Sequence, residues 1–457
     1  MESIFAPLPA KPDHSALELE VLARWESEQS FERLREKNQG GKRWSFIDGP
    51  ITANKKMGVH HMWGRTLKDV FVRFRALQGY DQRYQNGYDC QGLWIEVGVE
   101  QELGLNSKRE IEEYGLEAFA RHCRDKVIWS TGEITRQSKR LGQWLDWGAD
   151  YFTFSDTNIE YIWRFLKTLH DRGWLYLGHR ATEWCPRCGT SISAHELTTG
   201  DAYRDKIDPS LYVRFPLLER PGEALAVWTT TPWTLPANVA AAVDPEAAYV
   251  KVQTDGESLW LAGPLLEQVP VTGKVVDELP GEKLVGWRYT GPFADLPAAS
   301  EVEYRVVAWD EVSMEEGTGI VHIAPGCGAE DFALGKELGL PMLAPLDESG
   351  IFIEGFGFLT GRDVRDSVEP VVEHLRHHGR FYRLEDYSHR YPHCWRCSTP
   401  LIFRLVDEWY ISMGPVYDKP RSELSKEEVD ASLRYQIMDI VDGIRWIPSF
   451  GYERELD

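Results

Sequence analysis

Four of the seven cysteines stand in two Cys-x-x-Cys pairs, Cys185 with Cys188 and Cys394 with Cys397. Each pair places two thiols in one tight turn, so each turn can offer two ligands to a tetrahedral ion. Two such turns together predict a four-thiolate site for a structural Zn²⁺. The alternatives are two unrelated redox pairs, or His393 in place of one cysteine. The long gap between the pairs has room for an inserted domain.

A cluster of hydroxyl groups lies in residues 228–238, closed by two prolines. Hydroxyls can hold a water molecule and a ribose without introducing charge. A second run, residues 317–332, contains several glycines, which let a backbone approach a ligand closely, and it also carries His322 and Asp331. Taken separately, the threonines also suit the edge of a β-strand, and His322 suits a packed core histidine.

Two adjacent histidines, His60 and His61, follow a loop that begins at Gly49. At the start of a helix, unpaired backbone N–H groups and the positive end of the helix dipole favour phosphate. The two imidazoles could donate hydrogen bonds to phosphate oxygens during phosphoryl or nucleotidyl transfer. The alternative is a helix cap beside a packed imidazole.

The elements around these histidines predict a parallel sheet. Residues 44–48 are expected to form a buried strand, residues 63–77 a helix and residues 80–84 the next strand, which makes a βαβ unit. An open sheet of this kind binds its ligand beyond the carboxyl ends of its strands. The helix is expected to pack on the sheet through one apolar stripe, Leu67, Val70, Phe71, Phe74 and Leu77. An amphipathic helix over 16–35 precedes the unit, and 111–175 is expected to be largely helical.

Short Val-, Leu- and Trp-rich runs between turns over 211–307 predict a β-rich barrel or sandwich, followed by a helix over 366–378. The chain has 457 residues, which suggests two to four domains. Its formal net charge of −21 means that the chain as a whole has no excess of basic residues of the kind that indicates nucleic-acid binding. No signal peptide and no membrane-length apolar run occur, and the cysteine usage fits a reducing compartment, so a cytoplasmic protein is expected.

Four motifs in the first hundred residues have the same order and spacing as in a known family. They are Pro50-x-x-Ala53-Asn54, Gly58-Val59-His60-His61, Leu67-Lys68-Asp69 and the run from Gly87 to Glu96. Together they resemble the class I aminoacyl-tRNA synthetases, most closely the isoleucyl, valyl and leucyl members. The later segment Thr-Pro-Trp-Thr-Leu-Pro-Ala-Asn, which ends at Asn238, resembles the corresponding motif of the isoleucyl enzymes and differs from that of the valyl enzymes.

The chain departs from the family pattern in two places. The usual His-x-Gly-His is here Gly58-Val59-His60-His61, with the first and third positions exchanged. This exchange resembles a signature in a subtype of bacterial isoleucyl enzymes that resists the antibiotic mupirocin. Gln91 replaces a family histidine, and Tyr88 and Trp94 differ as well, which leaves the wall of the amino-acid pocket less defined.

The resemblance implies roles in amino-acid activation, with ATP and Mg²⁺ as substrate. His61 is implied to act on the ATP phosphates, and we hypothesise that His60 takes over part of the lost first histidine's role. Asp89 is implied to pair with the α-ammonium of isoleucine, and a carboxylate is the apt partner for an ammonium. The implied ATP-binding residues are Asn54, Gly58, His60 and His61, and the implied amino-acid pocket consists of Pro50, Asp89 and Gln91.

The resemblance also implies hydrolytic editing of misattached valine. An extra methylene distinguishes isoleucine from valine by only about 1–3 kcal/mol, a range established with enzymes of this kind, so a second pocket must reject the smaller product. Asp331 is implied to bind the α-ammonium of valine, and His322 to contact the terminal adenosine or the side chain. A positioned water can attack the ester without a protein nucleophile. The residues implied to shape the pocket are Thr229, Thr230, Thr231, Thr234 and Asn238.

The implied fold class is α/β, with a Rossmann-like parallel-sheet catalytic domain, an inserted β-rich editing domain and a zinc ribbon. The first domain is expected over 1–180, with the N-terminal helix and the first half of the catalytic fold. The first zinc knuckle is expected over 181–205, the editing domain over 206–385, the second knuckle over 386–405, and a return towards the catalytic domain over 406–457.

The family's second signature, Lys-Met-Ser-Lys-Ser, does not occur in the sequence. We therefore expect a shortened chain that does not aminoacylate tRNA by itself. The expected partners are tRNA(Ile), isoleucine and ATP, with no DNA and no membrane, and a monomer is expected. Two other classes of protein stay open: a free-standing deacylase that clears mischarged tRNA, and a structural RNA-binding module with a zinc ribbon. The intact nucleotide loop weighs against the first, and the acidic composition against the second.

Overall fold

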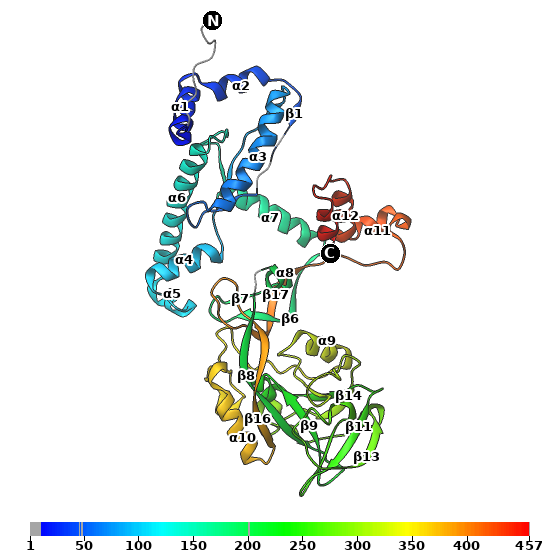
Figure 1. The fold of residues 1–457 in the computed structure, drawn as a ribbon. Coiled ribbons are helices and arrows are strands. Elements are labelled where there is room, and N and C mark those ends of the chain that lie inside the picture. The colour runs from blue at the N-terminus through cyan, green and yellow to red at the C-terminus, as the bar shows by residue number, and fades with distance from the viewer. Residues whose placement is uncertain (1–10, 45, 47–48, 200–201, 457) are drawn as a thin grey trace. The chain divides into compact units, whose positions relative to one another are not determined.

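The computed structural model describes residues 11–44, 46, 49–199 and 202–456. The chain divides into two compact units, Met1–Asp171 and Arg172–Asp457 (Figure 1). None of the helices among the described residues is both long enough and apolar enough to cross a membrane.

The first unit is an α/β structure with two small parallel sheets. The strands β1 and β3 pair in parallel on either side of α3, which confirms the predicted βαβ unit. The strand expected over 44–48 is seen only at its start, because residues 45, 47 and 48 lie outside the described residues. In the second sheet β4 lies between β2 and β5, again in parallel. The strands of this unit are β1 Arg43–Trp44, β2 Ile51–Thr52, β3 Asp81–Gln82, β4 Gly87–Asp89 and β5 Tyr151–Phe152.

Helices make up most of the first unit, as predicted for its later part. The prediction of one continuous helix over 16–35 is wrong, because Gln29 has a positive φ of 50° and divides the segment in two. A non-glycine residue in this left-handed conformation cannot continue a right-handed helix. The helices are α1 His14–Ser27, α2 Ser30–Asn38, α3 Val59–Leu77, α4 Leu93–Leu103, α5 Lys108–Tyr114, α6 Leu116–Arg140 and α7 Asp156–Asp171.

The apolar stripe of α3 does not pack on the sheet, contrary to expectation. Its side chains are exposed, with Leu77 the most exposed at 86%. The helix instead buries Arg65, Val72 and Ala76. Arg65 donates hydrogen bonds to Gln143 and Asn86, so a polar network and small side chains hold this helix in place. The members of the exposed stripe are Leu67, Val70, Phe71, Phe74 and Leu77.

The second unit is β-rich, as the sequence predicts. A six-stranded sheet has the order β13-β11-β12-β9-β8-β16, and a three-stranded sheet has the order β14-β10-β15. Large side chains such as Trp260, Tyr249 and Phe215 are fully buried in the core of this unit. The strands are β8 Tyr203–Pro216, β9 Glu223–Thr229, β10 Ala240–Val243, β11 Ala248–Gln253, β12 Ser258–Ala262, β13 Lys274–Pro280, β14 Arg305–Ala308, β15 Ile320–Ile323 and β16 Phe381–Pro392.

A third sheet of the second unit, β17-β6-β7, holds two distant parts of the chain together. The strands β6 Leu175–Cys185 and β17 Ile402–Ile411 pair antiparallel along their length, from Leu175 opposite Ile411 to Trp184 opposite Ile402, and β7 Thr190–Ser191 returns on β6. The helices of this unit are α8 Ala194–Thr199, α9 Ala329–Leu338, α10 Val368–His377, α11 Lys426–Asp430, α12 Leu433–Asp442 and α13 Phe450–Leu456. The helix α10 confirms the one predicted over 366–378.

Seven short 3-10 helices complete the elements assigned to the described residues, and all of them lie in the second unit. They are η1 Pro232–Ala237, η2 Gly263–Leu265, η3 Gly281–Lys283, η4 Pro297–Ala299, η5 Gly357–Leu359, η6 Val364–Asp366 and η7 Arg421–Glu423.

Candidate functional site

A cavity of about 340 Å³ opens in the second unit where β9, η1, β15 and α9 meet. Both sequence runs singled out for their chemistry contribute to its wall. The predicted residues in the lining are Thr229, Thr230, Thr231, Thr234, His322 and Asp331. The other lining residues are Trp228, Trp233, Ser313, Glu316, Gly317, Thr318, Gly319, Ile320, Val321, Ala324, Cys327, Gly328, Glu330 and Phe403.

The threonines are positioned by the turn that follows β9. The strand ends at Thr229, whose Oγ1 accepts a hydrogen bond of 3.1 Å from the Thr231 backbone N–H. Pro232 then starts η1, since its fixed φ suits the first position of a helix and its missing N–H costs nothing there. The Thr234 hydroxyl turns back and donates to the Thr231 carbonyl oxygen at 2.8 Å. These hydrogen bonds therefore fix the positions of the threonine hydroxyl groups.

His322 lies in the middle of β15, opposite Ala241 of β10. Its Nε2 is 2.9 Å from Oγ1 of Thr234. Because the Thr234 hydroxyl proton is donated to Thr231, Nε2 of His322 must be the donor and Nδ1 an acceptor. Burial lowers the pKa of His322 to about 4, so the ring is neutral at physiological pH. Its Nδ1 is buried and has no hydrogen-bond partner among the described residues.

Asp331 stands in the first turn of α9, where the helix dipole favours a negative charge. Its Oδ2 accepts a hydrogen bond of 2.7 Å from the Ala324 backbone N–H, just after β15. Burial raises the pKa of Asp331 to about 6 despite that bond. The ionised carboxylate of Asp331 is therefore poorly solvated in this cavity, and a cationic partner would stabilise it.

Asn238 lies outside the cavity, although it belongs to the same sequence motif. It is 1% exposed, its Nδ2 donates to the Ala240 carbonyl oxygen at 2.8 Å, and its Oδ1 accepts from the Tyr289 hydroxyl at 2.9 Å. These bonds fix the start of β10, so Asn238 supports the wall from behind.

Several lining residues were not singled out from the sequence, among them Glu316 and Trp228. Glu316 accepts a hydrogen bond of 2.6 Å from the Tyr387 hydroxyl, which comes from β16. Gly317 has a φ of +73°, and a Cβ there would come within 2.6 Å of the Trp228 ring. This glycine therefore allows the Trp228 ring to pack against the backbone at the cavity wall.

In the first unit, the loop that begins at Gly49 ends at Gly58, the N-cap of α3. His60 and His61 form the first turn of that helix, with ring centroids 3.9 Å apart. Nδ1 of His61 accepts a hydrogen bond of 3.1 Å from the Gly58 backbone N–H, so the neutral ring carries its proton on Nε2. Burial, followed by the charges of His60, Lys55 and Arg65, lowers the pKa of His61. A neutral imidazole with its proton on Nε2 is a hydrogen-bond donor suited to a phosphate oxygen.

The carboxyl ends of the neighbouring strands β2 and β4 bring Thr52 and Asp89 together. The Thr52 hydroxyl donates to Oδ2 of Asp89 at 2.8 Å. Pro50 immediately precedes β2, and Asn54 follows it in the same loop. This is the position at which an open parallel sheet binds ligands.

Gln91 lines a separate cavity of about 380 Å³ in the first unit, and its side-chain oxygen accepts from the Thr153 hydroxyl at 2.9 Å. Neither Pro50 nor Asp89 belongs to that lining. The lining consists of Cys90, Gln91, Gly92, Ile95, Glu96, Phe119, Ala120, Cys123, Arg124, Phe154 and Asp156.

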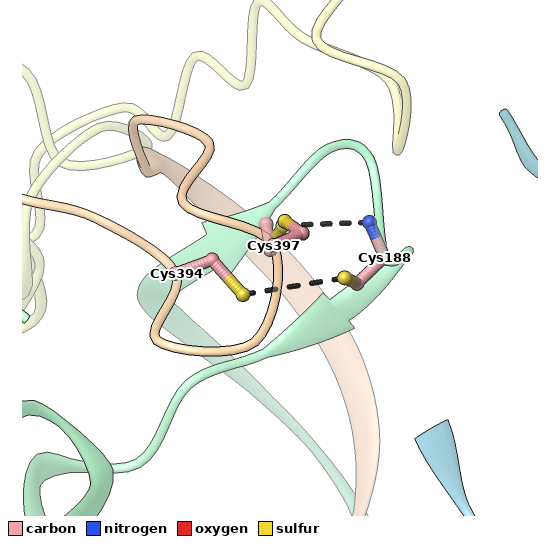
Figure 2. A group of neighbouring side chains, drawn as sticks. Cys188, Cys394 and Cys397 are labelled. Atoms are coloured by element: carbon pink, nitrogen blue, oxygen red, sulfur yellow. Dashed lines mark hydrogen bonds between the residues drawn. The ribbon is translucent and has the colours of Figure 1, made fainter. Parts of the chain in front are cut away.

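The two cysteine pairs meet in space, as predicted. Cys185 and Cys188 come from the turn between β6 and β7, and Cys394 and Cys397 from the segment between β16 and β17. Figure 2 shows the sulfurs of Cys188 and Cys394 facing one another across the two turns. One sulfur from each of the four residues lies within 4.8 Å of the others, and His393 is not part of the group.

The sulfur distances suit a tetrahedral ion. Sγ of Cys185 is 3.5 Å from Sγ of Cys397, and Sγ of Cys188 is 4.0 Å from Sγ of Cys394. Zn–S bonds of about 2.3 Å at tetrahedral angles place sulfurs roughly 3.8 Å apart. Hydrogen bonds from Cys185 and Cys188 lower the pKa of Cys394 to about 6, and the same two thiols lower that of Cys397. The donor set and its spacing fit Zn²⁺.

The sequence of this chain is similar to those of known proteins. The family described as tRNA synthetases class I (I, L, M and V) matches residues 20–455. An isoleucine–tRNA ligase of Thermobifida fusca is 41% identical over 428 residues, which are 92% of this chain and 40% of that protein. One of Thermus thermophilus is 43% identical over 408 residues, 88% of this chain and 38% of that protein.

A solved ternary complex of Agrobacterium radiobacter K84 agnB2 LeuRS with tRNA and LeuAMS aligns with 86% of this chain and 49% of that chain, at 14% identity and a TM-score of 0.34. The chain thus spans about 40% of the length of the curated relatives it matches. Because the family match covers residues 20–455, including the loop before α3 and the threonine-lined cavity, the chain belongs to the class I tRNA synthetases of the I, L, M and V group, and its curated relatives at about 40% identity are isoleucine–tRNA ligases.

Proposed function

We propose that this chain provides the editing and part of the amino-acid-activating machinery of an isoleucine–tRNA ligase. In this function ATP, with Mg²⁺, activates isoleucine for transfer to tRNA(Ile), and a separate pocket hydrolyses valyl-tRNA(Ile). The observation that carries the proposal is the cavity in which a threonine cluster, a neutral His322 and Asp331 meet.

The chemistry of that cavity suits an aminoacyl ester. The Asp331 carboxylate pairs with the α-ammonium of valine, which offsets the cost of keeping a charge in a buried site. Thr229, Thr230 and Thr231 hold the ester and a water molecule by neutral hydrogen bonds. The water oxygen forms a bond to the ester carbonyl carbon, the bond to the ribose oxygen breaks, and that oxygen takes up a proton as valine leaves as the free acid.

His322 provides an acceptor in the same pocket. Its buried Nδ1 lacks a partner within the described residues, and an unpaired polar atom in a buried site costs about 1–3 kcal/mol. Because Nδ1 is buried, a hydroxyl of the terminal ribose or the attacking water donates to it only once the ring or its neighbours shift on substrate binding. Because the pKa of His322 is about 4, the ring accepts this proton in a hydrogen bond and does not act as a cation.

The first unit supplies the groups for activation. The Nε2–H of His61 donates to an ATP phosphate oxygen, and His60 presents a second imidazole from the same helical turn. The nucleotide is bound along the loop that contains Asn54 and Gly58. Asp89, oriented by the Thr52 hydroxyl, pairs with the ammonium of isoleucine, and Pro50 borders the substrate. Gln91 lines a cavity that includes neither of these residues, so its part in the amino-acid pocket rests on the sequence motif alone.

A structural Zn²⁺ belongs at Cys185, Cys188, Cys394 and Cys397. When bound, the ion links the two turns at the base of the β-rich part of the second unit. All four positions are taken by protein sulfurs, as in closed structural sites, so the ion takes no part in hydrolysis.

The decisive experiment measures deacylation of valyl-tRNA(Ile) by this chain. We expect hydrolysis that falls at least about a hundredfold in Asp331→Ala, because the ammonium then loses its buried partner. Glu337→Ala, on an exposed part of the same helix, is the matched control and is expected to keep the wild-type rate. Equal rates for the two variants would remove the assigned role of Asp331.

The activation half is tested by binding. Isoleucine binding is expected to weaken strongly in Asp89→Asn and to persist in Asp150→Asn, a carboxylate of the same unit that accepts from Asn86. A free-standing deacylase, the second candidate function, predicts no isoleucine binding by either protein.

A further inference from the structure

A second group of metal-ligating side chains lies on the β-rich unit, and it is distinct from the four cysteines. His374 of α10 and His378, the C-cap of that helix, are one helical turn apart, with ring centroids 4.2 Å apart. Asp295 reaches the same place from another segment, with its Oδ1 3.2 Å from Nε2 of His374. One ligand atom of each residue lies within 4.8 Å of the others.

The His374 ring is held rigidly. It stacks on Phe293 at a centroid distance of 4.6 Å and on Phe358 at 5.0 Å, with interplanar angles of 14° and 17°. Its side chain is only 9% exposed, whereas that of Asp295 is 47% exposed. A fixed imidazole next to an accessible carboxylate can receive an ion from solvent with little loss of side-chain freedom.

The tautomer of His378 leaves its Nε2 as the nitrogen that can bind a metal ion. Its Nδ1 is 2.9 Å from the His374 carbonyl oxygen, which can only accept, so Nδ1 carries the proton. Nε2 of His378 therefore presents a lone pair. A histidine ligand in metalloproteins commonly donates its other ring N–H to a carbonyl in this way.

His374 already presents a ligand nitrogen to the carboxylate. Its Nε2 faces Oδ1 of Asp295 across 3.2 Å. On metal binding the ring changes tautomer: the proton leaves Nε2, Nδ1 gains one, and the ion takes the place between Nε2 and Oδ1.

The distances and charges suit a transition-metal ion. Bonds of about 2.0–2.2 Å from nitrogen and oxygen at a tetrahedral angle place two ligand atoms roughly 3.4 Å apart, close to the 3.2 Å found. Two imidazoles and one carboxylate favour Zn²⁺ and its neighbours over Mg²⁺ or Ca²⁺. Arg380, a cation near this group, donates a hydrogen bond to the Pro292 carbonyl oxygen at 2.5 Å, and its charge interacts with that of Asp295.

We propose that Asp295, His374 and His378 form a second metal site, which binds a divalent transition-metal ion of the Zn²⁺ class and clamps α10 to the segment that carries Asp295. Three protein ligands leave a fourth position for water or another donor. The site does not depend on the synthetase function proposed above.

The test counts bound Zn²⁺ in the whole chain by atomic emission after equilibration with excess ion. The wild type is expected to hold one more equivalent than His378→Ala, with the cysteine site contributing equally to both. His377→Ala is the matched control, an exposed histidine of the same helix outside the group, and should bind like the wild type. His378 is itself exposed, so its variant is expected to fold.

Calorimetric titration of Zn²⁺ into protein already saturated at the cysteines supplies a second readout. Asp295→Asn should weaken this binding by at least about tenfold. No extra equivalent in the wild type, or an equal loss in His377→Ala and His378→Ala, would overturn the proposal.

Discussion

Nε2 of His322 lies 2.9 Å from Oγ1 of Thr234, although 88 residues separate them in the chain. This bond joins the two sequence runs that build the cavity, one from η1 and one from β15. It also orients the histidine, since the threonine hydroxyl has already donated its own proton to the Thr231 carbonyl. One hydrogen bond thus fixes both the position and the tautomer of the ring.

Replacing Thr234 with valine keeps the shape of the side chain and removes the acceptor of the His322 N–H. A buried donor left without a partner costs about 1–3 kcal/mol, so the free energy of unfolding should fall by that amount. Denaturant unfolding measures it. Thr360→Val, at an exposed threonine, is the control and should stay close to the wild type. Equal losses in both would show that the His322 contact contributes nothing.

Deacylation should depend on the ionisation of Asp331. Its pKa of about 6 in the folded protein means that the carboxylate, which pairs with the substrate ammonium, is present above that pH and is lost as pH falls through it. The logarithm of kcat/KM should therefore rise with unit slope up to about pH 6 and then level off. A Glu330→Gln protein should keep this limb but shift it to lower pH, because the charge of Glu330 helps to raise the pKa of Asp331. A flat profile from about one unit below that pKa to about one unit above it would contradict the assignment.

The same carboxylate should destabilise the fold at high pH. Its folded pKa lies above its ordinary value of 3.8, so the folded state binds the proton more tightly, and stability falls as pH rises from about 4 to about 6. Asp331→Asn removes that cost and should stabilise the protein by about 1–2 kcal/mol at about pH 8, with little change at about pH 4. Thermal unfolding at the two pH values checks this. A destabilised variant at the higher pH would mean that the carboxylate has an unrecognised partner.

Loss of one zinc ligand should release the ion from the cysteine cluster. Cys397→Ser should lower the Zn²⁺ content by one equivalent and destabilise the β6–β17 sheet, because binding energy of a structural ion is folding energy. Cys123→Ser, outside the cluster, is the control. Hydrogen exchange along β6 and β17 reports the effect. Unchanged metal content in Cys397→Ser would remove the four-sulfur site.

His60 should influence the titration of its neighbour His61. Burial is the main cause of the lowered pKa of His61, and the charge of His60 adds to it. His60→Ala should therefore raise the pKa of His61 towards its ordinary value without restoring it fully. NMR titration of the imidazole signals measures this. A His61 pKa that stays the same or falls in His60→Ala would contradict the close arrangement of the two rings.

Local sequence patterns were sufficient to predict the elements and the clusters with strong chemical preferences. The cysteine pairs were predictable across a gap of roughly 200 residues because few arrangements other than metal binding need two such turns. The βαβ unit and the β-rich segment followed from the spacing of apolar residues. The roles of the threonines and Asp331 were assigned from the family's sequence motifs, and the structure brings these residues to one cavity.

Other features depend on three-dimensional contacts that no local pattern contains. The spacing of Leu67 and Phe71 shows that α3 has an apolar stripe, but not what covers it, and here the buried face is built around Arg65. Asn238 has the same motif context as the threonines, and only its bonds to Ala240 and Tyr289 reveal a supporting role. The meeting of Asp295 with His374 depends on a loop far away in the chain.

The antiparallel pairing of β6 with β17 has a consequence for how the β-rich part of the second unit relates to the rest of the chain. The two strands that connect this part to the rest of the chain, β6 and β17, pair with each other. Residues 186–401 therefore form a long excursion of the chain whose two ends are held together. The entropy of closing a loop grows only as the logarithm of its length, so lengthening or shortening this excursion hardly changes the cost of bringing its ends together. An insertion or a deletion within it can therefore be tolerated without disturbing the strand register at its base. Evolution can therefore change the length of this excursion while the strands at its base stay paired.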